Sequence, residues 1–577
     1  MNRKGLWPIV VIPIVLLLWS RIGAPALGSA SYQSYTQYKG VYRAGGTPGA
    51  SGEPIVEQVV IFVVDGLRVD ESRQLPELNR LRALGAQRVL QVGQPSLSYP
   101  GWTTISTGAW PEQSGVSSND IERAVELDTI FAAAHRVGLH SAIVGAGGWR
   151  TLFDPENVEL HILSQPQYNS LGDVLTLDER LAGEAREVLM REPQLALIHL
   201  LGVDNAGHGF GGASAEYAQV AVAADQLISD MMALIDLNRA AVLVTADHGH
   251  IDSGGHGGHE GVVRRVPLVA IGKGIKPGVY GDGNLVDIAP TVAVLLGMEI
   301  PAHNQGEALL DQMDVPVAFS ARRSLHVAEQ LFDRHGALLV AINSPIQVGR
   351  GMLERAQDAF AGGDFAEAEK LARTSGHQAR AEWRAQRGAR LMRERVLRGP
   401  TVALLLLPFG LYGLYWRLIG WGFRTPILGA LLFFVWWHAA FRVQGFSFSA
   451  SWFNPDPMLF ARPRVVDAML TLTAVICLVG ALRRRFGNAD VSRTAVHTLL
   501  LIGAGMVVQI AAYYLAWDVV YFWYLPDLNA GAKYYLDVAI SSVFWPHPML
   551  PLAGLLPLMA IMVARCSAVV ERRMLRI

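Results

Sequence analysis

Cysteine is scarce in this chain of 577 residues, and neither sign of charge dominates. The two cysteines, Cys477 and Cys566, lie in or beside apolar runs without a neighbouring Cys or His. This argues against a disulfide framework and against a thiolate metal site. The chain carries 49 Lys and Arg against 50 Asp and Glu. It therefore lacks the global basic field that attracts nucleic acid, and we expect no nucleic-acid partner.

Hydrophobic residues, in contrast, are abundant, at 51% of the chain. Near the N-terminus, Arg3 and Lys4 precede an apolar run over residues 5–19 that has the form of a secretory h-region. We interpret residues 1–30 as a signal peptide or signal anchor that leaves the following part of the chain outside. Residues 31–55 are rich in Gly, Ser, Tyr and Pro, which is typical of a linker.

The C-terminal third has the composition of a membrane domain. Long apolar runs occur near 400–420, 425–441, 465–482, 494–517 and 540–564. They predict an α-helical bundle of five transmembrane helices over residues 399–577. Basic segments at 416–424, 483–493 and 565–577 are expected to face the cytoplasm. We therefore expect a multi-pass cell-membrane protein with the lipid bilayer as a partner and the region before Pro400 outside the cytoplasm.

Between these apolar ends, residues 56–320 have the pattern of an α/β domain. Short β-branched runs at 59–66, 195–204, 240–249 and 266–274 alternate with amphipathic segments, which predicts a largely buried sheet. Residues 321–398 are polar and helical in pattern, and we interpret them as a helical connector.

Three of the predicted strands end in residues of the kind that bind metals. These residues are Asp65, then Asp204 and His208, then Asp247 and His248, and the last pair is followed by His256 and His259 in a Gly-rich loop. The carboxyl ends of parallel strands meet at one edge of a sheet, so ligands distant in sequence can converge there. Carboxylate and imidazole together suit zinc or another transition metal better than calcium. The alternatives are a turn or cap role for Asp65 and a solvated polar loop for the histidines.

A fourth element is the hydroxyl-rich segment 95–115, PSLSYPGWTTISTGAWPEQSG. A hydroxyl at the start of a helix beside a metal would be held for attack on phosphorus. The competing interpretation is an ordinary helix cap at Thr103 or Thr104, and spacing alone does not choose between them. Asn119, further along, is either a phosphate-binding residue or a structural one.

Five short motifs carry a specific resemblance to a known superfamily. The motifs VVDGLR, YPGWTTISTG, GVDNAGHG, TADHGH and GGHGG occur in the order seen in the alkaline phosphatase superfamily, over about residues 57–310. The segments resemble type I phosphodiesterases/nucleotide pyrophosphatases, and LHLLGVDNAGH with DHG and SGGHGG is most similar to the GPI ethanolamine phosphate transferases. The C/S-x-P-x-R motif of sulfatases is absent near Thr104.

The resemblance implies an alkaline-phosphatase-like central sheet flanked by helices and two divalent metal ions, usually zinc. One ion would be held by Asp65, Asp247, His248 and the oxygen of Thr104, and the other by Asp204, His208 and His256. Thr104 would be the catalytic nucleophile and form a phosphothreonine. Two positions have alternatives, because Thr103 adjoins Thr104 and His259 could replace His256.

These expectations together describe a membrane-anchored, two-metal phosphoryl-transfer enzyme. Its substrate would be a phosphoester, and a phosphoethanolamine-like head group on a lipid or glycan would be transferred or hydrolysed. The alternative is a tethered nucleotide pyrophosphatase or phosphodiesterase that acts on soluble substrates. A transporter or scaffold with a degenerate domain is disfavoured by the near-complete set of metal ligands.

Overall fold

A mixed sheet of nine strands carries the core of the protein. The computed structural model describes residues 46–397 except 120, 165–169 and 342, together with 424–443 and a few single positions beyond 400. The central strands are runs of aliphatic and β-branched residues, buried over nearly their whole length. Such runs suit strands whose two faces are both covered by helices.

Most of the neighbouring strands in the sheet are parallel. They are β1 (Gln58–Val64), β2 (Ala86–Gln91), β3 (Ser141–Ala146), β4 (Glu159–Leu163), β5 (Leu195–Leu200), β6 (Ala240–Thr245), β7 (Arg265–Gly272), β8 (Gly278–Val279) and β9 (Gly283–Asn284). Their order in the sheet is β4-β3-β5-β1-β6-β7-β2-β8, and β9 pairs with β2. Strand β7 is antiparallel to both of its neighbours, β6 and β2.

The three strands in the middle of the sheet, β5, β1 and β6, determine where the site lies. Strand β1 runs parallel to β5 on one side and to β6 on the other. The carboxyl ends of all three strands therefore open at one edge of the sheet, where ligands gather in folds of this kind. The prediction of an α/β domain with a buried central sheet flanked by helices is confirmed.

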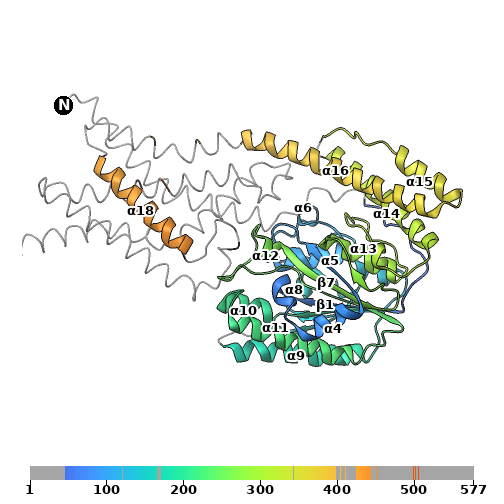
Figure 1. Ribbon diagram of the computed structural model, residues 1–577, viewed down its shortest axis with the longest axis horizontal. Helices are drawn as coiled ribbons and strands as arrows, with labels where there is room; N and C mark the ends of the chain where they lie inside the picture. Colours follow the sequence, from blue (N-terminus) through green and yellow to red (C-terminus); the bar gives the residue numbers. More distant parts are fainter. Residues whose placement is uncertain are drawn as a thin grey trace, which may run out of the picture.

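Helices cover both faces of the sheet (Figure 1). One group consists of α4 (Pro76–Leu84), α9 (Leu171–Leu189), α10 (Gly202–Phe210) and α11 (Ala215–Met232), which pack against one another. The other consists of α5 (Ser98–Thr107), α7 (Ile130–Arg136) and α13 (Ile288–Leu295). Short helices fill the connections: α3 (Val69–Ser72), α6 (Pro111–Ser114), α8 (Gly148–Leu152) and α12 (Gly261–Arg264).

Three long helices follow the sheet domain. Helix α14 (Val317–Ala341) packs along α16 (Phe365–Leu397), and α15 (Gly351–Ala361) packs against both. They share a small apolar core of their own, which includes Leu325, Leu353 and Leu371. In Figure 1, α16 extends away from the sheet domain.

The predicted membrane segments fall almost wholly outside the described residues. The exception is the second, 425–441, which coincides with helix α18 (Arg424–Val443). Within the described ranges, no helix combines the length and the apolar character needed to cross a bilayer. The N-terminal segment 1–30 lies outside the described part of the chain, and so do the other four apolar runs apart from a few single positions.

Helix α10, which carries two of the predicted ligands, is anchored by Asp178 from α9. The buried carboxylate accepts hydrogen bonds from the amides of Leu201 (2.9 Å) and Gly202 (3.0 and 3.1 Å). These amides begin the helix, where backbone N–H groups have no partner within the helix. Burial raises the pKa of Asp178 to about 7, against the opposing effect of the two amides.

We expect Asp178→Ala to destabilise the protein by roughly 1–3 kcal/mol, because it leaves two buried amides without an acceptor. Asp178→Asn keeps one acceptor oxygen and should cost less. Thermal unfolding of the purified full-length chain measures both effects. An Asp178→Ala protein that unfolds at the wild-type temperature would show that the start of α10 does not depend on this contact.

Candidate metal centre

Metal-type side chains lie at the carboxyl edge of the three central strands. Asp65 follows β1 directly, and Asp247 follows β6 after one intervening residue. Strand β5 leads into α10, whose first turn carries Asp204 and whose last turn carries His208. Gly66 makes the turn after Asp65 with φ 74°, a left-handed conformation that glycine adopts without strain. The sheet thus delivers carboxylates from three separate segments to one place.

The first group of close ligand atoms comprises Asp65, Asp247 and His248, which are all buried. His248 Nε2 lies 3.3 Å from Asp65 Oδ1 and 3.6 Å from Asp247 Oδ2. These three ligand atoms lie within 4.8 Å of one another. That spacing allows one cation to contact all three side chains.

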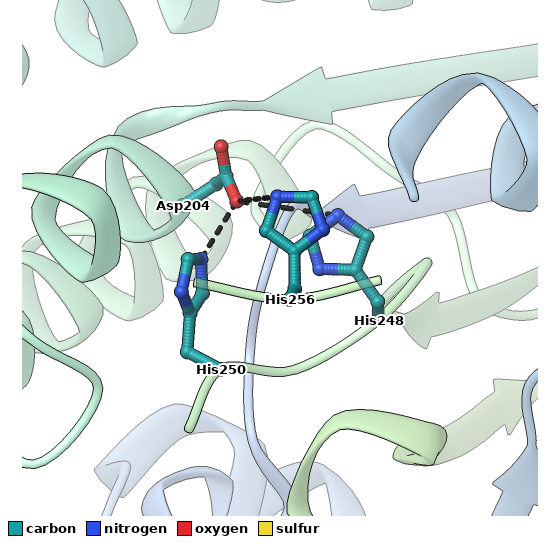
Figure 2. Close-up of side chains that lie close together, drawn as sticks. All are labelled: Asp204, His248, His250 and His256. Atoms are coloured by element: carbon teal, nitrogen blue, oxygen red, sulfur yellow. Dashed lines mark hydrogen bonds and ion pairs between the residues drawn. The ribbon is translucent and has the colours of Figure 1, made fainter. Parts of the chain in front are cut away.

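The second group forms around Asp204, and Figure 2 shows three imidazoles that converge on its carboxylate. Asp204 Oδ1 lies 2.7 Å from His250 Nε2, 3.4 Å from His256 Nε2 and 4.0 Å from His248 Nε2. His208 adjoins this group, with Nε2 3.0 Å from His256 Nε2 and 3.5 Å from Asp204 Oδ2. His248 belongs to both groups, so the two groups are contiguous.

The electrostatics of the carboxylates depend on burial and on their neighbours. Burial, followed by repulsion from Asp247 and Asp204, raises the pKa of Asp65 well above its ordinary value. Burial also raises the pKa of Asp247. Burial acts in the same direction on Asp204, but the neighbouring imidazoles, first among them His208, outweigh it and hold that pKa well below its ordinary range. The Asp65–Asp247 pair therefore needs a positive partner in order to be ionised.

The side chains at this place are suited to bind a cation as that positive partner. Asp65 Oδ1 is buried without a hydrogen-bond donor, although it faces His248 Nε2. A buried oxygen of this kind is costly unless a cation compensates it, and a mixed carboxylate and imidazole set suits a transition metal. Either group of close ligand atoms offers a place for a divalent cation: Asp65, Asp247 and His248 in the first, and Asp204 with His248, His250 and His256 in the second. His208 adjoins the second group without belonging to it. His259 belongs to neither group of close ligand atoms in the described part of the chain.

Thr104 does not lie at the N-terminus of its helix, where it was predicted. It lies in the second half of α5, and its hydroxyl donates a hydrogen bond to the Pro100 carbonyl at 2.7 Å. This is the bond that a threonine inside a helix makes to the preceding turn. Its neighbour Thr103 is also buried within the helix. The position of Thr104 does not support its predicted roles as nucleophile and metal ligand.

Ser98 occupies the place that was predicted for Thr104. It is the first residue of α5, and its Oγ lies 3.3 Å from His248 Nε2. Asn119 Nδ2 lies 3.4 Å from the same oxygen, and Asn119 Oδ1 accepts a hydrogen bond from the Tyr99 amide at 3.0 Å. The signal in the sequence was Pro100, because proline is tolerated in the first turn of a helix and so places the start just before it.

Sequence reasoning also missed His199 and His250. His199 lies in the middle of β5 and contacts Asp65 Oδ2 at 2.9 Å. Burial lowers the pKa of His199 to about 3 and the pKa of His250 to about 4, so both imidazoles are neutral. The signal for His199 was a histidine within an otherwise apolar run, LALIHLLG. His250 was visible within TADHGH, but nothing in the spacing separated it from its neighbours.

Part of this chain is similar to known proteins. Residues 59–259 match the family model of type I phosphodiesterase/nucleotide pyrophosphatase. GPI ethanolamine phosphate transferase 1 of Emericella nidulans is 26% identical over 338 residues, which cover 47% of this chain and 36% of that protein. The catalytic subunit of GPI ethanolamine phosphate transferase 3 of Mus musculus is 27% identical over 297 residues, covering 46% and 27%. The chain thus spans 36% or less of the length of these curated relatives.

Among solved structures, murine ectonucleotide pyrophosphatase/phosphodiesterase 5 is 15% identical, with a TM-score of 0.38. That alignment covers 44% of this chain and 100% of the other. The matched family segment begins in β1 and ends at His259, so it contains every predicted metal ligand from Asp65 to His256. The part of the chain that builds the site, residues 59–259, is therefore similar to the type I phosphodiesterase/nucleotide pyrophosphatase family.

Proposed function

We propose that the chain is a metal-dependent phosphotransferase or phosphodiesterase in which Ser98 attacks phosphorus. The observation that carries the proposal is the position of Ser98 Oγ, 3.3 Å from His248 Nε2 and at the N-terminus of α5. A hydroxyl at that place lies beside the candidate ligands and faces the end of a helix that favours anions. His248, which belongs to both ligand groups, joins the nucleophile to the rest of the site.

Two divalent cations, for which zinc is the first candidate, would activate the hydroxyl and neutralise charge on the phosphate. Asp65, Asp247 and His248 would hold one, and Asp204, His208 and His256 the other. Asn119 Nδ2, 3.4 Å from Ser98 Oγ, is placed to donate to a phosphate oxygen. The positive end of the α5 helix dipole adds to this anion site.

The reaction proceeds in two displacements. In the first, a bond forms between Ser98 Oγ and phosphorus, the bond from phosphorus to the leaving alcohol breaks, and the serine proton ends on that alcohol. In the second, an acceptor alcohol or water forms a bond to phosphorus, the bond between Ser98 Oγ and phosphorus breaks, and the proton of the acceptor returns to Ser98 Oγ. A transferase and a phosphodiesterase differ only in this second acceptor, so one site serves both.

The substrate we favour is a phosphoethanolamine-like phosphodiester on a lipid or glycan. Both curated relatives described above are named GPI ethanolamine phosphate transferases, and the predicted membrane domain would bring a lipid-linked substrate within reach. The second candidate is a tethered hydrolase of soluble nucleotides or diesters, favoured by the description of the family model. Transfer of phosphoethanolamine to a lipid acceptor distinguishes the first candidate, and lipid-independent hydrolysis of a nucleotide diester distinguishes the second.

A contact with Ser451 supports a site close to the membrane. Ser451 lies between the predicted membrane segments 425–441 and 465–482, and it is buried. Its hydroxyl accepts a hydrogen bond from the Gly258 amide at 2.9 Å and donates one to Glu260 at 2.8 Å. These partners belong to the loop that also carries His256. The predicted orientation places this part of the chain on the same side of the membrane as the catalytic domain.

Ser98→Ala should lower turnover by at least about 1,000-fold, because it removes the attacking atom. Metal content should stay at the wild-type value, and Ser98→Thr, which keeps a hydroxyl, should retain measurable activity. Thr104→Val is the matched control, since it removes only the bond to Pro100 and should cost about 1 kcal/mol of stability with little loss of turnover. Single-turnover assays on a phosphodiester test both variants. An inactive Thr104→Val with an active Ser98→Ala would restore Thr104 as the nucleophile.

The proposed orientation predicts that the catalytic domain is outside and the C-terminal tail inside. The two native cysteines allow a clean test with a membrane-impermeant maleimide on sealed membranes of known orientation. Cys566 alone, with Cys477→Ser, should be labelled only after permeabilisation. Ala233→Cys, at an exposed position after α11, should be labelled in sealed membranes when both native cysteines are replaced by serine. The opposite labelling pattern would reverse the topology.

A further inference from the structure

The buried histidines around the site differ in what faces their Nδ1 atom, and this difference fixes their tautomers. A neutral imidazole has one nitrogen that donates a proton and one that offers a lone pair. A neighbour that can only donate must face the lone pair, and a neighbour that can only accept must face the N–H. The group that faces Nδ1 therefore shows whether Nε2, which faces the site, carries a proton or a lone pair.

His256 and His248 share one arrangement. His256 Nδ1 lies 3.0 Å from the Ser96 carbonyl, and His248 Nδ1 lies 3.3 Å from the Gly249 carbonyl. A carbonyl oxygen only accepts, so both Nδ1 atoms carry the proton. In the neutral rings both Nε2 atoms then present a lone pair toward the carboxylates, which is the state that a metal-binding imidazole needs.

His250 has the reverse arrangement, although its Nε2 lies within the second ligand group. The Gly255 amide donates to His250 Nδ1 at 3.1 Å, so Nδ1 holds the lone pair and Nε2 carries the proton. That proton is donated to Asp204 Oδ1 across 2.7 Å. The ring is fully buried and lies against Gly207, where a Cβ atom would come within 2.6 Å of it. A proton, and not a lone pair, therefore points from His250 into the centre.

His199 repeats this arrangement at the other carboxylate. The Trp149 indole N–H, which can only donate, lies 3.1 Å from His199 Nδ1. Nε2 therefore carries the proton and donates it to Asp65 Oδ2 at 2.9 Å. Trp102 and Trp149 pack edge-on against the imidazole, with ring centroids 4.6 and 5.6 Å away. The buried ring has no room to turn over without the loss of both hydrogen bonds.

We propose that His199 and His250 are positioning residues, one for each cation site, and that neither binds a metal. Each donates its Nε2 proton to one oxygen of a carboxylate and turns the other oxygen toward an imidazole of the ligand set. For Asp65 that imidazole is His248, 3.3 Å from Oδ1. For Asp204 it is His208, 3.5 Å from Oδ2, while Oδ1, which accepts from His250, also lies 3.4 Å from His256 Nε2. This inference rests on the proposed function, because it presupposes that the site binds cations.

Paired amide substitutions test the assignment. In His→Gln the side-chain amide reaches about as far as Nε2 and can still donate to the carboxylate, whereas in His→Asn it reaches only about as far as Nδ1. The purified full-length chain is stripped of metal and titrated with Zn²⁺ alone, followed by Co²⁺ absorption spectra of each variant. His256→Asn serves as the reference for the loss of a ligand.

The wild type should bind two ions, and His256→Asn should lose one. His199→Asn and His250→Asn should keep two ions but bind one of them about 10–100-fold more weakly, the usual effect of removing a group that orients a metal ligand. His199→Gln and His250→Gln should stay within a few-fold of wild type. The Co²⁺ spectra of the Gln variants should match the wild type, since the ligands are unchanged.

Other results would overturn the assignment. A His250 or His199 variant that loses a whole ion, as His256→Asn does, would identify that histidine as a ligand. Asn variants with wild-type affinity, or Gln and Asn variants that are equally weak, would show that the Nε2 proton does not orient the carboxylate. A wild-type chain that binds no Zn²⁺ would instead remove the proposed function, so the two failures are distinguishable.

Discussion

The rest of the site depends on three aspartates at one edge of the sheet, of which Asp65 and Asp247 are buried and Asp204 is partly buried. Asp65, Asp204 and Asp247 reach this place because β1, β5 and β6 are adjacent, parallel and in register. Negative charge gathered away from water is unstable unless it is neutralised or fully hydrogen-bonded. The surrounding residues supply that compensation in two forms, as N–H donors and as imidazole nitrogens that suit a cation. The chemistry of the site is thus a consequence of the sheet order.

Aromatic residues provide the donors and also exclude water. The Trp102 indole N–H donates to Asp247 Oδ2 at 2.9 Å, while Trp149 acts on Asp65 through His199. The two indoles stack with centroids 4.8 Å apart and an interplanar angle of 6°. Trp102 belongs to α5 and Trp149 to α8, so this stacking holds the helix that carries Ser98 as well as the carboxylates. The same two tryptophans therefore contribute both the packing and the hydrogen bonds of the site.

Much of this arrangement could be predicted from the sequence, since it follows from local patterns. Buried strands have short aliphatic runs, and the residues that end them, such as Asp65 and Asp247, fall at a common edge in any parallel sheet. The proposed nucleophile was harder to predict, because segment 95–115 contains several hydroxyls within a few residues. Thr104 stood out by resemblance, yet only the start of the helix, set by Pro100, distinguishes Ser98.

The roles of the histidines could not be predicted in the same way. His250 and His256 lie in one Gly-rich loop, and no spacing rule shows that one faces a backbone amide and the other a carbonyl. That difference arises from how the loop folds over α10, which is tertiary information. His199 depends on Trp149, which lies 50 positions earlier in the chain. Sequence reasoning finds the residue types of such a site, while long-range contacts decide what each one does.

The central claim is that this edge of the sheet holds two cations on the predicted carboxylates and imidazoles. Anomalous diffraction above and below the zinc K-edge, from crystals of the full-length chain grown with Zn²⁺, tests it most directly. The account predicts two peaks about 4 Å apart. One should lie about 2 Å from atoms of Asp65, Asp247 and His248, and the other about 2 Å from Asp204, His208 and His256. A single peak, peaks elsewhere, or no peak would contradict it.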